Sequence, residues 1–313
     1  MALGRFAWAV LAYNLAVVLW GAYVRVSFSG DGCGAHWPFC NGQVIPHGMA
    51  SAMAIEFTHR LMTSFDCAGA IILCAWAFLA FPRRHPARLF SVLAILFLLV
   101  EALLGAGLVL LRYVARDQSA GRAVYLSAHL TNTMLLLAVL TIAAWTIRNN
   151  QERIAWRGIS RQSWWMASVV ILVSITGAIA ALGDTLFPAS SLAMGMQRDF
   201  SNSSSLLLRL RLIHPVIAIG GAAYVVWGAV AFLRKAEEDG RRAAGRVLTL
   251  VLIQLAAGAV NLTLLAPVWM QLIHLLLADL VWIGVVLMIL ESARTRPAHF
   301  EAAELCRSTF ERS

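Results

Sequence analysis

Runs of twenty or more mostly apolar residues recur along the whole length of this chain. About 20 apolar residues in a helix are long enough to cross the hydrocarbon core of a bilayer. In that core a segment must satisfy its own backbone hydrogen bonds, so each run is expected to be an α-helix. The sequence therefore predicts an all-α membrane protein with eight transmembrane helices, at about residues 6–25, 52–81, 88–111, 123–147, 163–183, 206–233, 245–265 and 268–293.

The basic residues point to a membrane topology rather than to nucleic acid. The net charge is +9, but 17 of the 25 Lys and Arg residues fall at the N-terminus, at the C-terminus and in alternate loops. Positive residues gather on the cytoplasmic side of membrane proteins. We therefore expect a multi-pass protein of the inner (cytoplasmic) membrane with both termini in the cytoplasm, and no nucleic-acid partner. The first apolar run is expected to be a span and not a cleaved signal peptide.

Four histidines lie inside four of the predicted spans, in two pairs. His59 and His129 belong to the first half of the chain, and His214 and His274 belong to the second. An ionisable side chain inside a membrane helix is a functional-site hypothesis by default. Each histidine follows the outer start of its span by six to eight residues, which places all four about 10 Å below the outer boundary. This spacing favours two bis-histidine metal sites at one depth.

The two halves of the chain resemble a duplication. Spans one to four and five to eight carry the same small and polar residues in the same order. An even number of spans in each half gives both halves one orientation, so we expect two four-helix bundles related by a pseudo-twofold axis along the membrane normal. We assign residues 1–150 to the first half and 151–313 to the second, on the matches Gly21-Ala22 with Gly177-Ala178, His59 with His214, Glu101-x-x-x-Gly105 with Gln254-x-x-x-Gly258, and His129 with His274.

Haem fits two histidines at one depth on two helices of a bundle better than other cofactors. Small residues beside the ligands, such as Ala128, would let a flat ring approach the helices. A structural zinc site would need a tight cluster of Cys and His, and the spans contain none. Cys67 and Cys74 are seven residues apart in the second span and are interpreted as small apolar fillers.

The loop after the first span contains two cysteines seven residues apart, Cys33 and Cys40, among glycines. A pair in an oxidising, extracytoplasmic loop is typical of a disulfide. Closing so short a loop would stabilise the fold by roughly 2–3 kcal/mol in the chain-entropy model, enough to shape a lid. Two roles stay open from the sequence: a structural disulfide, or a redox-active pair that passes electrons or reacts with a partner.

Glu56 stands three residues before His59, so the two share a helix face. A buried carboxylate is costly unless it is paired. Arg60 or Arg25 could pair with it or with a haem propionate. Glu56 could take part in proton chemistry beside the porphyrin, or it could only orient His59. The second half has Arg211 at the matching position, which suggests that the first half performs the chemistry and that the second carries an electron-transfer haem.

Taken together, these residues resemble the haem A synthase family over essentially the whole chain. The resemblance rests on the eight spans in duplicated halves, the three further histidines, the motif Glu56-x-x-His59-Arg60 and the loop Cys33…Trp37-Pro38…Cys40-Asn41-Gly42. It implies an oxidoreductase that converts the C8 methyl group of haem O to a formyl group and so makes haem A for terminal oxidases.

Further expectations follow from this resemblance, residue by residue. His214 and His274 would ligate a haem B cofactor, His59 and His129 would hold the substrate haem O, and Glu56 would be the catalytic acid. A haem O synthase and an electron donor in the membrane are candidate partners. Some family members have a second cysteine pair in the outer loop between spans five and six. Here residues 183–205 contain no cysteine, so a mechanism that needs two pairs is in doubt.

Two other classes of protein remain open. A dihaem b-type cytochrome would explain the histidines, but not the cysteine loop or the acid beside only one site. A haem carrier or exporter would hold haem at the outer face and would have no need of Glu56.

Overall fold

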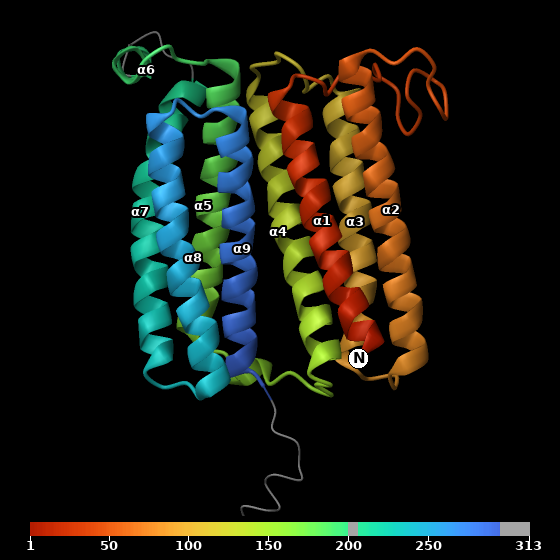
Figure 1. Ribbon diagram of the computed structural model, residues 1–313, viewed down its shortest axis with the longest axis vertical. Coiled ribbons are helices and arrows are strands. Elements are labelled where there is room, and N and C mark those ends of the chain that lie inside the picture. Colours follow the sequence, from red (N-terminus) through yellow and green to blue (C-terminus); the bar gives the residue numbers. More distant parts are fainter. Residues whose placement is uncertain (200–205, 295–313) are drawn as a thin grey trace, which may run out of the picture.

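The computed structural model describes residues 1–199 and 206–294, and it forms two four-helix bundles that stand side by side (Figure 1). The first bundle contains α1 (Ala2–Val26), α2 (Ser51–Ala80), α3 (Pro86–Leu110) and α4 (Ala120–Arg148). The second contains α5 (Arg161–Leu186), α7 (Leu206–Leu233), α8 (Glu238–Thr263) and α9 (Val268–Ser292). The all-α fold is confirmed.

Eight of the described helices are long and apolar enough to cross a membrane, and they coincide with the eight predicted spans. Most boundaries agree within a few residues, but α8 begins at Glu238, seven residues before the predicted start. Glu238 and Asp239 lie in its first turn, where acidic side chains interact favourably with the helix dipole. Residues that hydropathy assigned to a loop are therefore the polar first turns of a helix.

The turn between α8 and α9 is tight. Leu265 and Ala266 adopt left-handed conformations with φ of 62° and 53°. Pro267 then occupies the N-cap position of α9. Two short helices were not predicted: η1 (Trp156–Gly158) in the connection between the bundles, and α6 (Leu192–Asp199) in the loop that follows α5.

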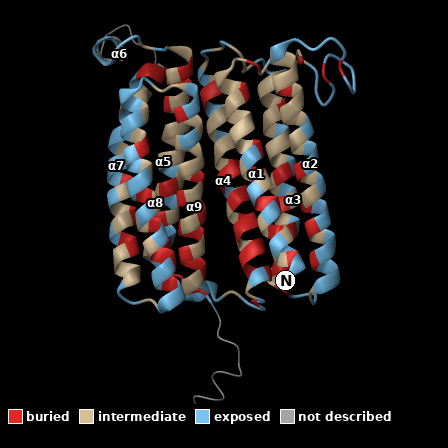
Figure 2. Cartoon of the chain, in the orientation of Figure 1, coloured by how far each residue is buried: buried red, intermediate tan, exposed pale blue. Residues whose placement is uncertain are grey.

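The two bundles meet along α4 and α9. The Trp282 indole of α9 donates to the carbonyl of Met134 in α4 at 2.7 Å, and the Trp145 indole of α4 donates to Glu291 at 2.8 Å. In the most apolar 18-residue stretch of α4, 78% of the residues are buried, whereas in the corresponding stretches of α2 and α7 only 22% are buried. Figure 2 shows the buried residues gathered on the inner helices. α4 is thus a central helix, whereas α2 and α7 turn most of their apolar surface outward.

The connections divide between two ends of the molecule (Figure 1). The loop after α1 and helix α6 lie at one end. The first residue, the α4–α5 connection and the end of α9 lie at the other. Corresponding helices of the two bundles therefore run in the same direction. We refer below to the end that carries the cysteine loop as the loop end.

Candidate functional site

The first histidine pair joins α2 and α4. His59 lies on α2 and His129 lies on α4. Glycines of the other two helices face them. A methyl group on Gly21 of α1 would lie 3.0 Å from Cε1 of His59, and one on Gly105 of α3 would lie 3.8 Å from Nε2 of His129. All four helices of the bundle therefore contribute to one site.

The second pair repeats this arrangement in the other bundle. His214 lies on α7 and His274 lies on α9. A methyl group on Gly177 of α5 would lie 3.1 Å from Cε1 of His214, and one on Gly258 of α8 would lie 3.1 Å from Cε1 of His274. The glycines that marked the repeat in the sequence are thus the residues that keep space beside the histidine rings. The prediction had assigned that task to neighbours such as Ala128.

These residues fit haem ligation. Nδ1 of His59 and Nδ1 of His274 are buried and have no hydrogen-bond partner among the described residues. A neutral imidazole nitrogen is a common metal ligand. In the described part of the chain, no group of three or more His, Cys, Asp or Glu side chains could hold a metal ion. Ligation of one ion by two facing histidines, as in a bis-histidine haem, therefore suits this structure better than a zinc cluster.

His129 has an acidic partner that sequence reasoning did not assign to the site. Oε1 of Glu101 on α3 lies 3.0 Å from Nδ1 of His129. The same carboxylate accepts hydrogen bonds from Asn132 and Thr133, one turn further along α4. Carboxylates that bind the second nitrogen of a ligating histidine fix its tautomer and ring orientation. The signal was present, because Glu101 is an acid inside a predicted span and matches Gln254 in the repeat.

The second pair has neutral partners. Nδ1 of His214 lies 3.0 Å from the hydroxyl oxygen of Thr176, and Nε2 of His274 lies 3.4 Å from the amide nitrogen of Gln254. The two sites therefore share their histidines and glycines and differ in the charge beside them.

At the loop end of the first bundle, Cys33 and Cys40 form a disulfide, as predicted. Both residues are buried, with exposed fractions of 0% and 2%. The loop is tied further by hydrogen bonds from the amide of Asn41 to the carbonyl of Cys33 and from the amide of Cys40 to Gln43. Reaction of a disulfide with a partner thiol requires access to a sulfur atom. Burial of this pair favours the structural role.

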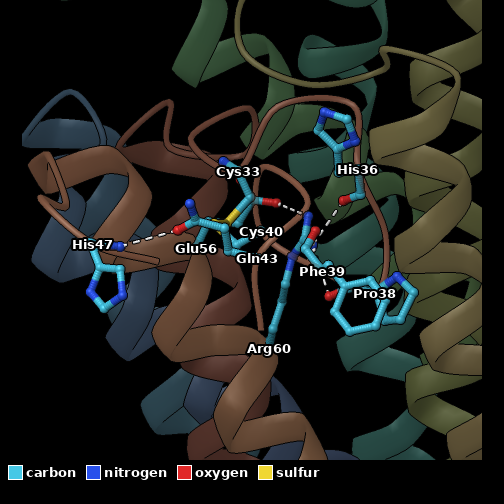
Figure 3. The surroundings of a disulfide bond; sticks show 9 residues. All are labelled: Cys33, His36, Pro38, Phe39, Cys40, Gln43, His47, Glu56 and Arg60. Carbon is cyan, nitrogen blue, oxygen red and sulfur yellow. Dashed lines mark hydrogen bonds and ion pairs between the residues drawn. A yellow bond between two sulfur atoms is a disulfide. The ribbon is translucent and has the colours of Figure 1, made fainter. Parts of the chain in front are cut away.

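Glu56 connects this loop to α2 (Figure 3). Its Oε2 accepts the backbone amide of Cys33 at 2.8 Å, and its Oε1 forms an ion pair with Arg60. The Arg60 guanidinium also donates to the carbonyls of Pro38 and Phe39 at 3.2 and 3.0 Å. Of the two arginines considered as partners, the structure pairs Arg60 with Glu56. Glu56 is bound to the loop rather than to His59.

The structure also places the other residues that were named as candidates from the sequence. Arg211, at the place of Glu56 in the second bundle, forms an ion pair with Asp184 at 3.1 Å. Cys67 and Cys74 are free cysteines, and Cys67 packs against the apolar core. The loop after α5 lies partly outside the described residues.

The chain is similar in sequence to several known proteins. Two proteins named protoheme IX farnesyltransferase, from two strains of Thermus thermophilus, are each 42% identical over 285 residues, which is 90% of this chain and 47% of theirs. A haem A synthase from an Exiguobacterium species is 28% identical over 174 residues, 55% of each chain. Another, from Halalkalibacterium halodurans, is 41% identical over 93 residues, 30% of this chain and 31% of the other.

The chain thus spans about half the length of the first curated relatives that it matches. A family model described as cytochrome oxidase assembly protein (COX15-CtaA) matches residues 4–286, which include both bundles, all four histidines and the disulfide loop. The chain therefore belongs to this family of cytochrome oxidase assembly proteins.

Proposed function

We propose that this protein is a haem A synthase, an oxidoreductase that converts the C8 methyl group of haem O to a formyl group. Family membership and the relatives named haem A synthase support this proposal. The observation that carries it is that two alike histidine sites have unlike surroundings. Both have glycines against the histidine rings, but only the first has a carboxylate in contact with a histidine, Glu101, and a second, Glu56, one helical turn away.

We assign the substrate site to residues 1–150 and the cofactor site to residues 151–313. His59 and His129 would hold haem O, and His214 and His274 would hold a haem B. A bound haem B would supply a one-electron redox centre next to the substrate bundle. The contact of α4 with α9 brings the helices that carry His129 and His274 together. Glu101 would orient His129 through Nδ1 and leave Nε2 for the iron.

Glu56 is the proposed catalytic residue. It lies one helical turn from His59 toward the loop end, and its exposed fraction is 3%. The amide of Cys33 donates to one of its carboxylate oxygens and the guanidinium of Arg60 donates to the other, so the carboxylate is held in one orientation. Oxidation of a methyl group releases protons, and a carboxylate held at the porphyrin edge can take them up at Oε1 or Oε2. The disulfide would serve this chemistry by fixing the amide of Cys33.

The proposed setting is the cytoplasmic membrane, with the loop end on the outer side and both termini in the cytoplasm. Haem O carries a farnesyl tail and would enter from the bilayer. An electron donor in the membrane is one proposed partner. A haem O synthase is another, and the name of the Thermus relatives supports it: farnesylation of protohaem is the step that makes haem O, and this chain matches only about half of those proteins.

The test is expression of the chain together with a haem O synthase in a host that lacks haem A. Haems are then extracted, separated and weighed by mass spectrometry. Haem A or its hydroxymethyl precursor is the expected result, with the Glu56→Ala variant retaining haem B and losing product. If well-folded protein with a bis-histidine spectrum gave only haem B and unmodified haem O, the cytochrome or carrier function would replace this proposal.

A further inference from the structure

Two arginines lie at the loop end of the first bundle, inside the membrane helices. Arg25 is in the last turn of α1, and Arg122 is in the first turn of α4. Arg25 donates across the boundary between the bundles, to the hydroxyl of Thr185 on α5 at 3.0 Å and to the amide oxygen of Gln271 on α9 at 3.3 Å. Its guanidinium therefore sits where the two bundles meet.

Arg122 is the more enclosed of the two, with an exposed fraction of 2%. Its Nη1 donates to the carbonyls of Ala115 and Asp117, both at 2.8 Å. Its Nε is buried and has no hydrogen-bond partner among the described residues. A buried guanidinium donor without an acceptor costs free energy, because water no longer solvates it.

Acids lie near these two arginines but make their direct side-chain contacts with other groups. Arg25 and Arg122 lie at the same end of α1 and α4, two helices that pack against each other. Neither forms an ion pair with a carboxylate in the part of the chain that the structure describes. Asp184 forms its ion pair with Arg211, and the Asp117 carboxylate accepts a hydrogen bond from the hydroxyl of Ser119. Two such cations in a membrane protein indicate a site for an anionic ligand.

Both arginines are aligned with the first histidine pair. Arg25 follows Gly21 by four residues, and Arg122 precedes His129 by seven, so each shares a helix face with a residue of the substrate site. At 1.5 Å per residue they lie about 6 Å and about 10 Å from it toward the loop end. The matching positions of the second bundle hold Ala181 and Pro267. The arginine pair is therefore particular to the first site.

We propose that Arg25 and Arg122 bind the two propionate carboxylates of the substrate porphyrin. This inference rests on the proposed function, which places haem O between His59 and His129. Haem O carries two propionates on one edge, and guanidinium groups bind carboxylates through strong, directional hydrogen bonds. Two ligand carboxylates would balance two arginine charges and give the Nε of Arg122 its missing acceptor.

Such an anchor has a consequence for the choice of methyl group. The C8 methyl shares its pyrrole ring with one propionate, and the C5 methyl shares its ring with the other. Propionates held at the loop end would bring these two methyl groups to the level of Glu56, which lies one turn from His59 in the same direction. The position of the farnesyl tail would then distinguish C8 from C5. Arg25 and Arg122 are positioning residues in this scheme.

The experiment compares binding of haem O with binding of its dimethyl ester, in which both propionates are esterified. The purified full chain with its resident haem is titrated in nanodiscs and followed by the Soret absorption. The proteins are the wild type, Arg25→Gln, Arg122→Gln and Arg122→Lys. Arg116→Gln is the control, since Arg116 is an exposed arginine of the same end that stacks on Phe28. Resident haem content is measured in each.

We expect the wild type and Arg116→Gln to bind haem O about tenfold or more tightly than the ester. Arg122→Gln and Arg25→Gln should weaken binding of haem O by a similar factor and leave the ester unchanged, and Arg122→Lys should recover part of the loss. A merely structural role would weaken both ligands equally and would overturn the inference. Equal wild-type affinity for the two ligands would also overturn it, with the proposed function intact.

Two further outcomes separate the alternatives. Loss of resident haem from both glutamine variants would show that the arginines bind the carboxylates of that haem instead, which contradicts the assignment. If the wild type bound neither haem O nor its ester, the proposed function itself would fail, and the inference with it. Should Arg25→Gln not fold, the Arg122 variants carry the same comparison.

Discussion

The two bundles have the same histidines and glycines in the same places and different charged groups around them. Each has two histidines faced by two glycines. The first bundle adds three acids to its helices, Glu56, Asp66 and Glu101, and the matching positions of the second hold Arg211, Gly221 and Gln254. The groups that bind these acids change with them: Asn14, Asn132 and Thr133 in the first bundle are matched by Val170, Leu277 and Ala278 in the second.

Acids and their hydrogen-bond donors differ together between the two bundles, and this difference bears on the proposed role of each half. An acid inside a membrane helix is expensive, and its hydrogen-bond donors are useful only while the acid is present. The second bundle lacks both the acids and their donors at these positions and keeps the histidines and the glycines beside them. It does contain a buried acid, Asp279, but that residue matches Met134 and has no counterpart in the acid set of the first bundle. This difference supports the proposal that the first half performs the chemistry.

The largest effect is expected from loss of a histidine in the second bundle. His214→Ala should remove the resident haem and abolish haem A formation, because the cofactor loses a ligand that the bundle cannot replace. Haem content of the purified protein, measured as the pyridine haemochrome, checks this. His47→Ala, in the exposed part of the cysteine loop, is the control. Full haem occupancy in His214→Ala would refute the assignment of the second site.

Glu56→Gln should lower haem A formation by about a hundredfold or more while resident haem stays in place, since a positioned acid or base typically contributes at least that factor. Product per resident haem is the quantity to measure. Asp66→Asn is the matched acid-to-amide control on the same helix, where Asn14 can still pair with the amide. Equal loss in both variants would mean that total negative charge matters, and not the position of Glu56.

Much of the fold could be predicted from the sequence because a membrane allows few alternatives. Apolar runs of span length must become helices, and so all eight helices were found. The error at α8 arose because hydropathy does not register a polar helix turn such as the one that begins at Glu238. Helix α6 was missed because a helix of eight residues is not specified by an apolar run.

The site was predicted by residue type but not by contact. The histidines, the disulfide and Glu56 were recognised from spacing and resemblance. That Glu56 binds the amide of Cys33, and that Glu101 binds His129, depends on how helices and loop pack, and sequence separations of 23 and 28 residues carry no such information. The internal repeat offered one route, since positions where two like sites differ are candidates for function.

Glu101→Gln makes the first site resemble the second at the position of Gln254. His129 would lose its charged partner, and we expect haem A formation to fall about tenfold, the lower end of the range for loss of a carboxylate behind a metal-bound histidine. Binding of haem O should weaken in parallel, which a Soret titration would detect. An unchanged affinity together with unchanged turnover would show that the carboxylate does not distinguish the two sites.

The smallest effect is expected from the glycines, and it tests whether space beside the histidine is limiting. Gly21→Ala would place a methyl group 3.0 Å from Cε1 of His59, so the ring must move by a few tenths of an ångström. The same change favours the helix by about 1 kcal/mol. We therefore expect thermal stability to hold or rise while the affinity for haem O falls about threefold, a loss that follows from ring displacement alone.

Gly69→Ala separates the two contributions. It lies on α2 away from the histidines, and its methyl group would meet Val10 at 3.5 Å, an ordinary contact. It should gain helix stability without loss of haem O affinity. Gly177→Ala, 3.1 Å from His214, should weaken retention of the resident haem instead. If Gly21→Ala bound haem O with the affinity of the wild type, His59 could shift freely. The different roles proposed for the two bundles would then have to depend on their charges alone.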